Sequence, residues 1–214
     1  MHPGPPNRLL TARPSALLLL AAGASSRLGQ PKQLLLYQGQ TLLRRAAETA
    51  AASGCWPLLL ITGCQHDQLL PEVAGLPFEI IRNENWAEGL SSSIRAGMAA
   101  LAELPAFDEP EPAAVLLMLC DQPLLMAAHL RQLIALQHET RSPAVASTYA
   151  GTAGVPVVFG PTLFEQLRTL AGPTGARQLL AQLPPTQVLT VDFPAGAVDV
   201  DTPAHYQQLL AGGA

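Results

Sequence analysis

Lysine is nearly absent from this 214-residue chain, in which Lys32 is the single lysine among 12 lysine and arginine residues. The sequence also has no basic tract, few aromatic residues (5%) and a net charge of −4. Proteins that bind nucleic acids carry clustered basic residues, so this composition argues against a nucleic-acid partner. An ammonium group is a compact point charge, whereas a guanidinium is a planar fork. A lone lysine therefore favours a role that needs a point charge at this position, with placement by chance as the alternative.

Long apolar runs and paired cysteines are missing as well. The hydrophobic residues (49%) are spread as alanine and leucine between polar turns, and no run approaches the roughly 18 apolar residues of a membrane span. Cys55, Cys64 and Cys120 form an odd set without a Cys-x-x-Cys pair. Such a set fits a reducing compartment better than a disulfide framework. We expect a cytoplasmic protein without membrane contact.

Short apolar runs alternate with amphipathic segments along the chain, which predicts a three-layer α/β protein with a mostly parallel, Rossmann-like sheet and helices on both faces. We expect a flexible tail over residues 1–14, rich in proline and glycine, and a single domain over 15–214. The expected strands are Ala16–Leu20, Pro57–Thr62, Phe78–Arg82, Ala113–Leu119, Ala144–Tyr149, Val155–Phe159 and Gln187–Val191. The expected helices are Leu42–Ser53, Gln65–Val73, Leu90–Leu104, a helix containing Gln132–Glu139, Pro161–Leu170, Gly175–Leu183 and Pro203–Leu210.

The first predicted strand ends at a turn of small residues that two cations follow. Apolar runs bounded by glycine suit strands buried in a parallel sheet, and ligands bind at the carboxyl edge of such sheets. Small side chains let backbone N–H groups approach a phosphate, whose charge Arg27 and Lys32 can neutralise. The spacing fits neither the Walker pattern nor Gly-x-Gly-x-x-Gly. We predict a nucleotide triphosphate site over Ala21, Ala22, Gly23, Ala24, Ser25, Ser26 and Lys32.

A carboxylate follows another buried strand of the predicted sheet. Asp121 comes directly after the apolar run Ala114–Leu119, so it should stand at the same edge as the small-residue turn. It is either a helix N-cap, a frequent role of aspartate, or a ligand of Mg²⁺, which prefers carboxylate and phosphate oxygens. We favour the metal and add Gln122 and Gly63, which ends the second strand, to the nucleotide-binding candidates.

Three consecutive serines open the helix predicted from Leu90. Free backbone N–H groups, the helix dipole and three hydroxyls form a plausible anion site. The alternative is a well-capped helix with polar decoration. The candidates for contact with an anionic substrate group are Gly89, Ser91, Ser92 and Ser93.

Two of the six aspartates stand near the end of the chain, at Asp199 and Asp201. In an extended segment both point the same way, and either is a candidate second metal ligand. A turn with a capping aspartate before Pro203 explains the pattern equally well.

Taken in order, these segments resemble the nucleotidyltransferases with a Rossmann-like domain of the nucleotide-diphospho-sugar transferase type. The carriers of the resemblance are Ala-Ala-Gly-x-Ser-x-Arg-Leu-Gly-x-x-Lys-Gln-Leu-Leu from Ala21, Trp-x-x-Gly-x-x-x-Ser-Ile from Trp86, Cys-Asp-Gln-Pro from Cys120 and Asp-x-Asp-Thr-Pro from Asp199. The stretch is most similar to the molybdenum cofactor cytidylyltransferase branch, where the aspartate corresponding to Asp121 ligates magnesium.

The resemblance implies transfer of CMP from CTP to the terminal phosphate of molybdenum-bound molybdopterin, with Mg²⁺ as cofactor and pyrophosphate as the second product. It further implies Lys32, Arg27 and Asp121 as catalytic residues, and a molybdenum hydroxylase or its chaperone as a protein partner. Another phosphorylated acceptor such as a sugar phosphate, GTP in place of CTP, and a non-catalytic molybdopterin carrier are the alternatives.

Overall fold

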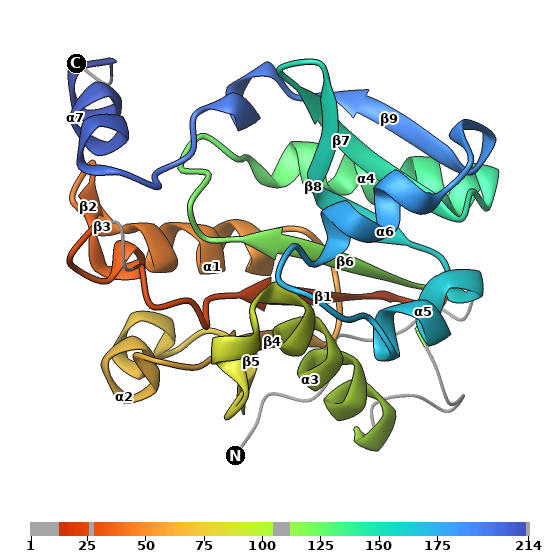
Figure 1. Cartoon of the computed structure of the whole chain (residues 1–214), viewed down its shortest axis with the longest axis horizontal. Coiled ribbons are helices and arrows are strands. Elements are labelled where there is room, and N and C mark those ends of the chain that lie inside the picture. Colours follow the sequence, from red (N-terminus) through yellow and green to blue (C-terminus); the bar gives the residue numbers. More distant parts are fainter. Residues whose placement is uncertain (1–12, 26–27, 105–111, 213–214) are drawn as a thin grey trace.

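The computed structural model describes residues 13–25, 28–104 and 112–212. Within these ranges, one sheet of seven strands runs in the order β5-β4-β1-β6-β8-β7-β9 (Figure 1). Its strands are β1 (Ser15–Leu20), β4 (Leu58–Thr62), β5 (Phe78–Arg82), β6 (Ala114–Leu119), β7 (Ala144–Tyr149), β8 (Thr152–Phe159) and β9 (Val188–Asp192). All neighbours pair in parallel except β8, which is antiparallel to β6 and β7. The predicted mostly parallel sheet is confirmed.

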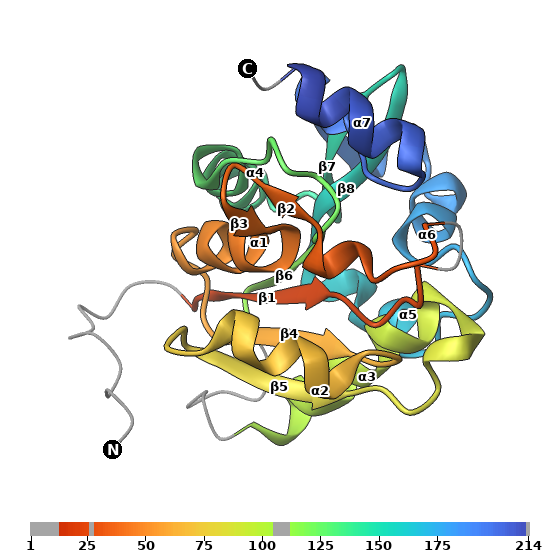
Figure 2. The same cartoon turned by 90° about the vertical axis from the view of Figure 1, so that its left-hand side faces the viewer.

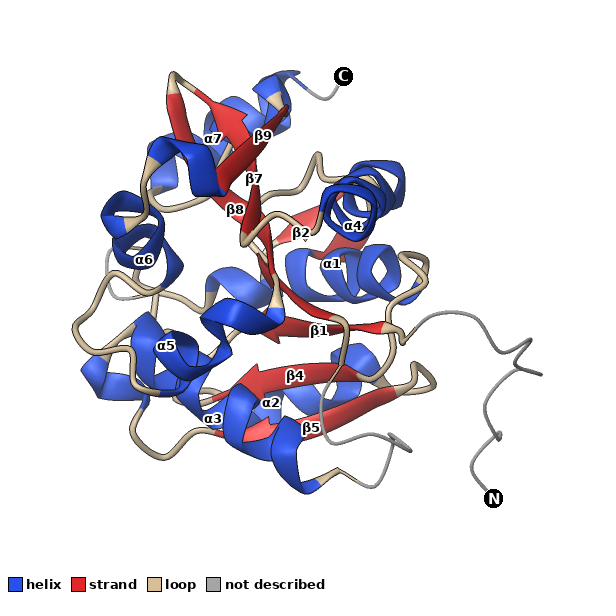
Figure 3. Cartoon of the chain, turned by 90° about the vertical axis from the view of Figure 1, so that its right-hand side faces the viewer, coloured by secondary structure: helices blue, strands red, loops and turns tan. Residues whose placement is uncertain are grey.

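Helices cover both faces of the sheet, as Figure 3 shows. The helices are α1 (Leu42–Ala51), α2 (His66–Leu69), α3 (Leu90–Glu103), α4 (Ala127–Thr140), α5 (Phe164–Arg168), α6 (Ala176–Gln182) and α7 (Pro203–Gly212). Every residue of β1 is buried. Leu17 and Leu19 pack in a cluster with α1 and α4, whereas Leu18 and Leu20 pack in a second cluster with α3, α5 and α6. Side chains alternate across a strand, so an apolar run that feeds two cores explains the three layers.

Two short strands between β1 and α1 were not predicted. Strands β2 (Leu36–Tyr37) and β3 (Gln40–Thr41) form a hairpin whose central residues, Gln38 and Gly39, both have positive φ. A third apolar cluster, which contains Tyr37, Leu42, Val200 and Leu209, joins this hairpin to α7. Figure 2 shows the ribbons of the hairpin and of α7. The C-terminal segment is thereby tied to the region that follows β1.

Several predicted boundaries were wrong for local reasons. The loop expected between β7 and β8 is a tight turn at Ala150–Gly151, since both residues adopt the positive φ that a two-residue hairpin requires. The helix expected over 65–73 divides into α2 and a 3₁₀ turn, Leu70–Val73, because Pro71 cannot donate an α-helical hydrogen bond. Likewise Pro161–Leu163 is a 3₁₀ turn before α5. The remaining 3₁₀ turns are Lys32–Leu34, Trp86–Glu88, Pro185–Gln187 and Pro194–Ala197.

No helix among the described residues is long and apolar enough to cross a membrane. The cysteines are free thiols, Cys55 and Cys120 buried and Cys64 exposed. Most of the expected N-terminal tail, residues 1–12, lies outside the described residues.

Candidate active site

Two loops leave the same edge of the sheet at the point where the strand order reverses. After β1 the chain continues on one side to β4 and β5, and β6 then pairs with the other side of β1. The register aligns Leu20 with Leu119, the last residues of β1 and β6. The residues that follow these two strands are therefore neighbours. In open α/β sheets, ligands bind in the crevice that forms at such a reversal.

The loop after β1 is held in shape by the buried amide of Gln33. Its Nε2 donates hydrogen bonds to the carbonyl oxygens of Ala21 (2.9 Å) and Gly23 (2.8 Å). Ser25, at φ 54°, donates from its hydroxyl to Gln33 Oε1 (3.2 Å) and accepts from the backbone N–H of Lys32 (3.0 Å). The loop is thus fastened to the turn that carries Lys32.

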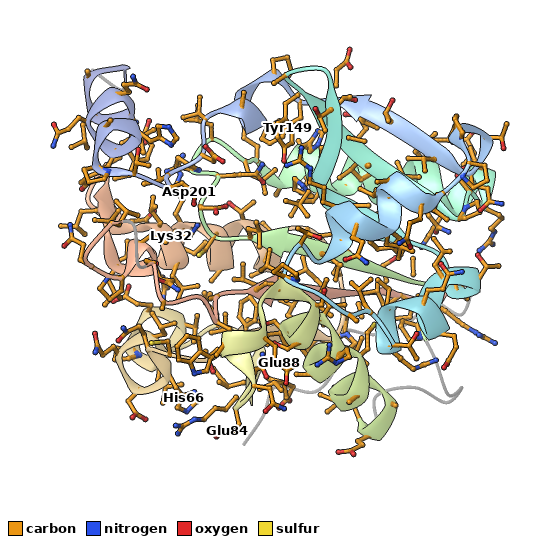
Figure 4. All side chains as sticks on the ribbon, in the orientation of Figure 1. Lys32, His66, Glu84, Glu88, Tyr149 and Asp201 are labelled. Atoms are coloured by element: carbon orange, nitrogen blue, oxygen red, sulfur yellow. The ribbon has the colours of Figure 1, made fainter. Side chains whose placement is uncertain are left out.

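The side chain of Lys32 lies between two carboxylates. Its Nζ is 2.6 Å from Asp121 Oδ2 and 2.8 Å from Asp201 Oδ1. Figure 4 shows Lys32 and Asp201 pointing toward each other from distant parts of the chain. Burial by itself lowers the pKa of this amine, but attraction to Asp121 and hydrogen bonds to both carboxylates outweigh it and raise the pKa above its usual value. Lys32 is therefore a permanent cation.

The two C-terminal aspartates reach this site because their segment is bound to the end of β6. The Val200 N–H donates to the carbonyl oxygen of Asp121 (3.1 Å), and the Val200 side chain is fully buried. Alternation then turns Asp199 and Asp201 to the other side, where both line the cavity. Burial, together with repulsion from Asp121 and Asp201, raises the pKa of Asp199.

A cavity of about 730 Å³ opens at this edge of the sheet. The loop after β1, Lys32 and the three aspartates form part of its wall, and the β7–β8 hairpin and the start of α6 contribute Tyr149 and Arg177. Among the described residues that line it, two cationic side chains meet three carboxylates. A triphosphate would be repelled by this surplus of negative charge unless further cations accompany it.

The donor atoms at Asp121 suit a hard divalent cation. Asp121 Oδ1 is buried and has no hydrogen-bond partner in the structure, while Oδ2 accepts from Lys32. Among the residues that the structure describes, no three His, Cys, Asp or Glu side chains form a ready-made metal site. Mg²⁺ is ordinarily held by one or two carboxylates plus substrate phosphates, so the residues present fit that ion with a nucleotide.

The expected hydroxyl site at the start of α3 has no support in this geometry. Ser91, Ser92 and Ser93 are 1–3% exposed and do not line the cavity. Asn83 Nδ2 donates to the hydroxyls of Ser92 and Ser93, and Ser91 donates to the Ala171 carbonyl oxygen. The serines are bonded internally, but the well-capped helix that we considered as the alternative is wrong, because the N-cap of α3 is Gly89, which provides no side-chain cap hydrogen bond. Contact of the serines with an anion stays a prediction.

Other candidates lie near the cavity without lining it. Gln122 is buried and donates to the carbonyl oxygens of Val155 (3.1 Å) and Gly196 (3.3 Å). Gly63 packs so tightly that a Cβ would lie 2.7 Å from the carbonyl oxygen of Ala22. Ala24 and Gly89 are likewise absent from the lining, whereas Ala21, Ala22, Gly23 and Ser25 belong to it. Ser26 and Arg27 lie outside the described residues.

Several polar residues of the cavity wall, among them Gln33, Tyr149 and Arg177, were not among the site residues predicted from the sequence. Gln33 is a polar residue before an apolar run, Leu34–Leu36, and its position beside Lys32 was the available signal. Tyr149 ends β7 and Arg177 lies in α6. The stretches Tyr149–Pro156 and Gly172–Arg177 also resemble the nucleotidyltransferases, which was the available signal, and their contact with substrate stays a prediction. Cys120 also lines the cavity, but burial raises its thiol pKa to about 12, so it stays protonated.

The fold and this cavity define an α/β protein of the nucleotide-diphospho-sugar transferase type, with a ligand site at the reversal of strand order. The sequence pattern of the MobA-like NTP transferase domain matches residues 17–188. The chain belongs to this family of nucleotidyltransferases.

Three curated proteins are similar over most of their length. Nicotine blue oxidoreductase of Paenarthrobacter nicotinovorans is 31% identical over 90% of this chain and 95% of its own. The purine catabolism protein PucB of Bacillus subtilis is 29% identical, over 90% and 94%. The molybdenum cofactor cytidylyltransferase of Escherichia coli is 26% identical, over 88% and 92%.

Two crystal structures of Rv0371c from Mycobacterium tuberculosis are similar in fold. One has a TM-score of 0.76 and 30% identity, covering 94% of this chain and 100% of that one. The other, a complex with manganese, has a TM-score of 0.71 and 29% identity, with the same coverage.

Proposed function

We propose that this protein transfers CMP from CTP to the terminal phosphate of molybdenum-bound molybdopterin, releasing pyrophosphate. The observation that carries the proposal is the ammonium of Lys32, which two carboxylates hold on the wall of the cavity, beside a loop of small residues. Family membership supports nucleotidyl transfer. The similarity to a protein named molybdenum cofactor cytidylyltransferase supports this particular nucleotide and acceptor.

The transfer needs positioning and charge more than covalent chemistry. An oxygen of the acceptor phosphate attacks the α-phosphorus of the nucleotide, and the bond to the β-phosphate oxygen breaks as pyrophosphate leaves. Lys32 stabilises the negative charge that grows on the α-phosphoryl oxygens. The backbone N–H groups of the loop from Gly23 and the cation Arg27 hold the β- and γ-phosphates.

Mg²⁺ is the proposed cofactor. Asp121 would hold it, with Asp201 or Asp199 as the second carboxylate. When bound, the ion would neutralise negative charge of the triphosphate. The unpartnered oxygen of Asp121 supports this assignment, as does the manganese complex of the similar Rv0371c.

The choice of base and acceptor separates this proposal from its alternatives. The methyl group of Ala22, on the cavity wall, favours cytosine over a purine by narrowing the space. GTP as donor, a sugar phosphate as acceptor and a non-catalytic pterin carrier are the competing functions.

One relative bears the name of an oxidoreductase, but the loop after β1 lacks the dinucleotide-binding pattern Gly-x-Gly-x-x-Gly. We place the reaction in the cytoplasm, with a molybdenum hydroxylase or its chaperone as recipient of the product.

The test is to incubate the protein with Mg²⁺, molybdenum-loaded molybdopterin and CTP, GTP or ATP, and to measure pyrophosphate while the product is identified by mass. We expect pyrophosphate with CTP and a product heavier by one cytidylyl group. Equal rates with all three nucleotides would defeat the base assignment. If turnover occurs only when a sugar phosphate is supplied in place of molybdopterin, the acceptor is a sugar phosphate. Binding of the pterin without turnover would favour the carrier function. NADPH oxidation in a parallel assay would point to redox chemistry.

A further inference from the structure

Gln33 has a buried amide whose oxygen and nitrogen both form hydrogen bonds. It is 1% exposed. Both Nε2 hydrogens are donated to loop carbonyls, at Ala21 and Gly23, and Oε1 accepts from the Ser25 hydroxyl. If the amide were reversed, its oxygen would face two carbonyl oxygens at hydrogen-bond distance. The partners therefore fix the orientation of the amide.

The same interactions determine where Lys32 stands. The Ser25 hydroxyl accepts a hydrogen bond from the backbone N–H of Lys32 and donates one to Gln33, so both of its hydrogen bonds are formed within the loop. The left-handed backbone of Ser25 (φ 54°) is unusual for a residue with a side chain, and it persists because these contacts over-determine it. One amide thus couples the shape of the loop to the base of the lysine.

We propose that Gln33 is a positioning residue for the nucleotide: it holds the loop from Ala21 to Ser25 and the backbone of Lys32 in the arrangement that receives the phosphates. This inference rests on the proposed function, because it takes the nucleotide phosphates as the ligand of the loop. Gln33 acts on the ligand through its neighbours. The Ser25 hydroxyl belongs to the same network, while its backbone N–H stays a candidate for contact with the phosphates.

The test compares Gln33→Met with Gln137→Met. Gln137 is a matched control, since it is 2% exposed and donates to the Ser142 carbonyl oxygen at 3.3 Å, in α4 and outside the cavity wall. The measurements are the dissociation constant of Mg·CTP, the KM values for nucleotide and acceptor, and hydrogen–deuterium exchange of the Lys32 amide. Ser25→Gly is a second variant, because glycine accepts the positive φ without strain while the whole side chain, with its hydroxyl, is removed.

We expect Gln33→Met to weaken Mg·CTP binding at least tenfold and to raise the nucleotide KM in proportion, with the acceptor KM unchanged. Exchange of the Lys32 amide should accelerate in Gln33→Met and in Ser25→Gly, and stay as in the wild type in Gln137→Met. If Gln33→Met does not fold, Ser25→Gly carries the same comparison with a smaller loss of affinity. A melting temperature that falls equally in both glutamine variants, with unchanged nucleotide binding, would reduce Gln33 to a structural residue.

The proposed function and this inference fail in different ways. A wild-type protein that binds no nucleoside triphosphate in the presence of Mg²⁺ overturns the proposed function. Unchanged exchange of the Lys32 amide in both Gln33→Met and Ser25→Gly overturns the inference, whichever nucleotide is bound.

Discussion

Lys32 and Asp121 are 89 positions apart in the chain, yet their Nζ and Oδ2 atoms lie 2.6 Å from each other. The contact exists because β1 and β6 pair in parallel and end at the same level. A cation and an acidic group with one unpartnered oxygen thus stand together at the mouth of a cavity.

Replacing Lys32 with alanine should lower the rate of pyrophosphate release by about a hundredfold or more, the effect of losing a principal charge contact in the transition state. Lys32→Arg should restore little, since a planar guanidinium cannot occupy the position of an ammonium between Asp121 and Asp201. The measurement is kcat at saturating substrates. Arg131→Ala is the control. Arg131 lies on α4 and donates a hydrogen bond to the Ala52 carbonyl oxygen. A Lys32→Ala variant that keeps its kcat would exclude the lysine from the reaction.

Substituting Asp121 with asparagine should weaken binding of a divalent cation, because the site loses a negative charge and a hard oxygen ligand. Titration of the nucleotide-bound protein with Mn²⁺, followed by electron paramagnetic resonance, should show at least a tenfold weaker affinity. Asp192→Asn, at an exposed carboxylate on β9, should leave the affinity as it is. Removal of the metal with a chelator should abolish turnover of the wild type. Equal Mn²⁺ affinity in the two variants would remove Asp121 from the metal site.

Alanine at Gly63 should destabilise the fold by about 1–3 kcal/mol through overpacking. A Cβ there would lie 2.7 Å from the Ala22 carbonyl oxygen and 2.7 Å from Trp86 Cβ, neither of which is the end of a flexible side chain. Urea unfolding measures the change in free energy. Gly212→Ala is the matched control, because nothing lies within 4 Å of its added Cβ. If the two variants unfold at the same urea concentration, the backbone around Ala22 yields more easily than this packing implies.

Asp199→Asn should raise thermal stability at neutral pH. Burial and repulsion from Asp121 and Asp201 raise the pKa of Asp199 in the folded protein, so the folded state binds a proton more readily than the unfolded state. Stability from this group is therefore present at low pH and is lost as the pH rises from the ordinary aspartate pKa through the raised one. The gain from Asp199→Asn should shrink as the pH falls toward 4, near the ordinary pKa of an aspartate.

Melting temperatures measured across this pH range test the idea. Asp192→Asn, at an exposed carboxylate on the edge strand, is the control, with little change expected at any pH. A gain for Asp199→Asn that grows toward low pH would contradict the sign worked out here.

Local patterns in the sequence were enough for the α/β class, for most strands, and for the loop and aspartate that meet at one sheet edge. An apolar run such as Leu17–Leu20 can only be satisfied by burial on both faces, which already implies a parallel sheet with two helical layers. The hairpin turns were harder to predict from the sequence, because Gln38 and Ala150 have positive φ and neither residue type favours that conformation.

Tertiary structure alone decided which polar groups face the cavity. The serines at the start of α3 stay candidates for contact with an anion, but only the structure shows that their hydroxyls bond to Asn83 and to the Ala171 carbonyl oxygen in the interior. Tyr149, at the end of β7, and Arg177, in α6, meet the loop after β1 at the cavity wall although they are far from it in the chain. Residue type and spacing predict on which face or at which end of its own strand or helix a polar side chain lies. Its partner depends on contacts between segments far apart in the chain, which sequence spacing does not encode.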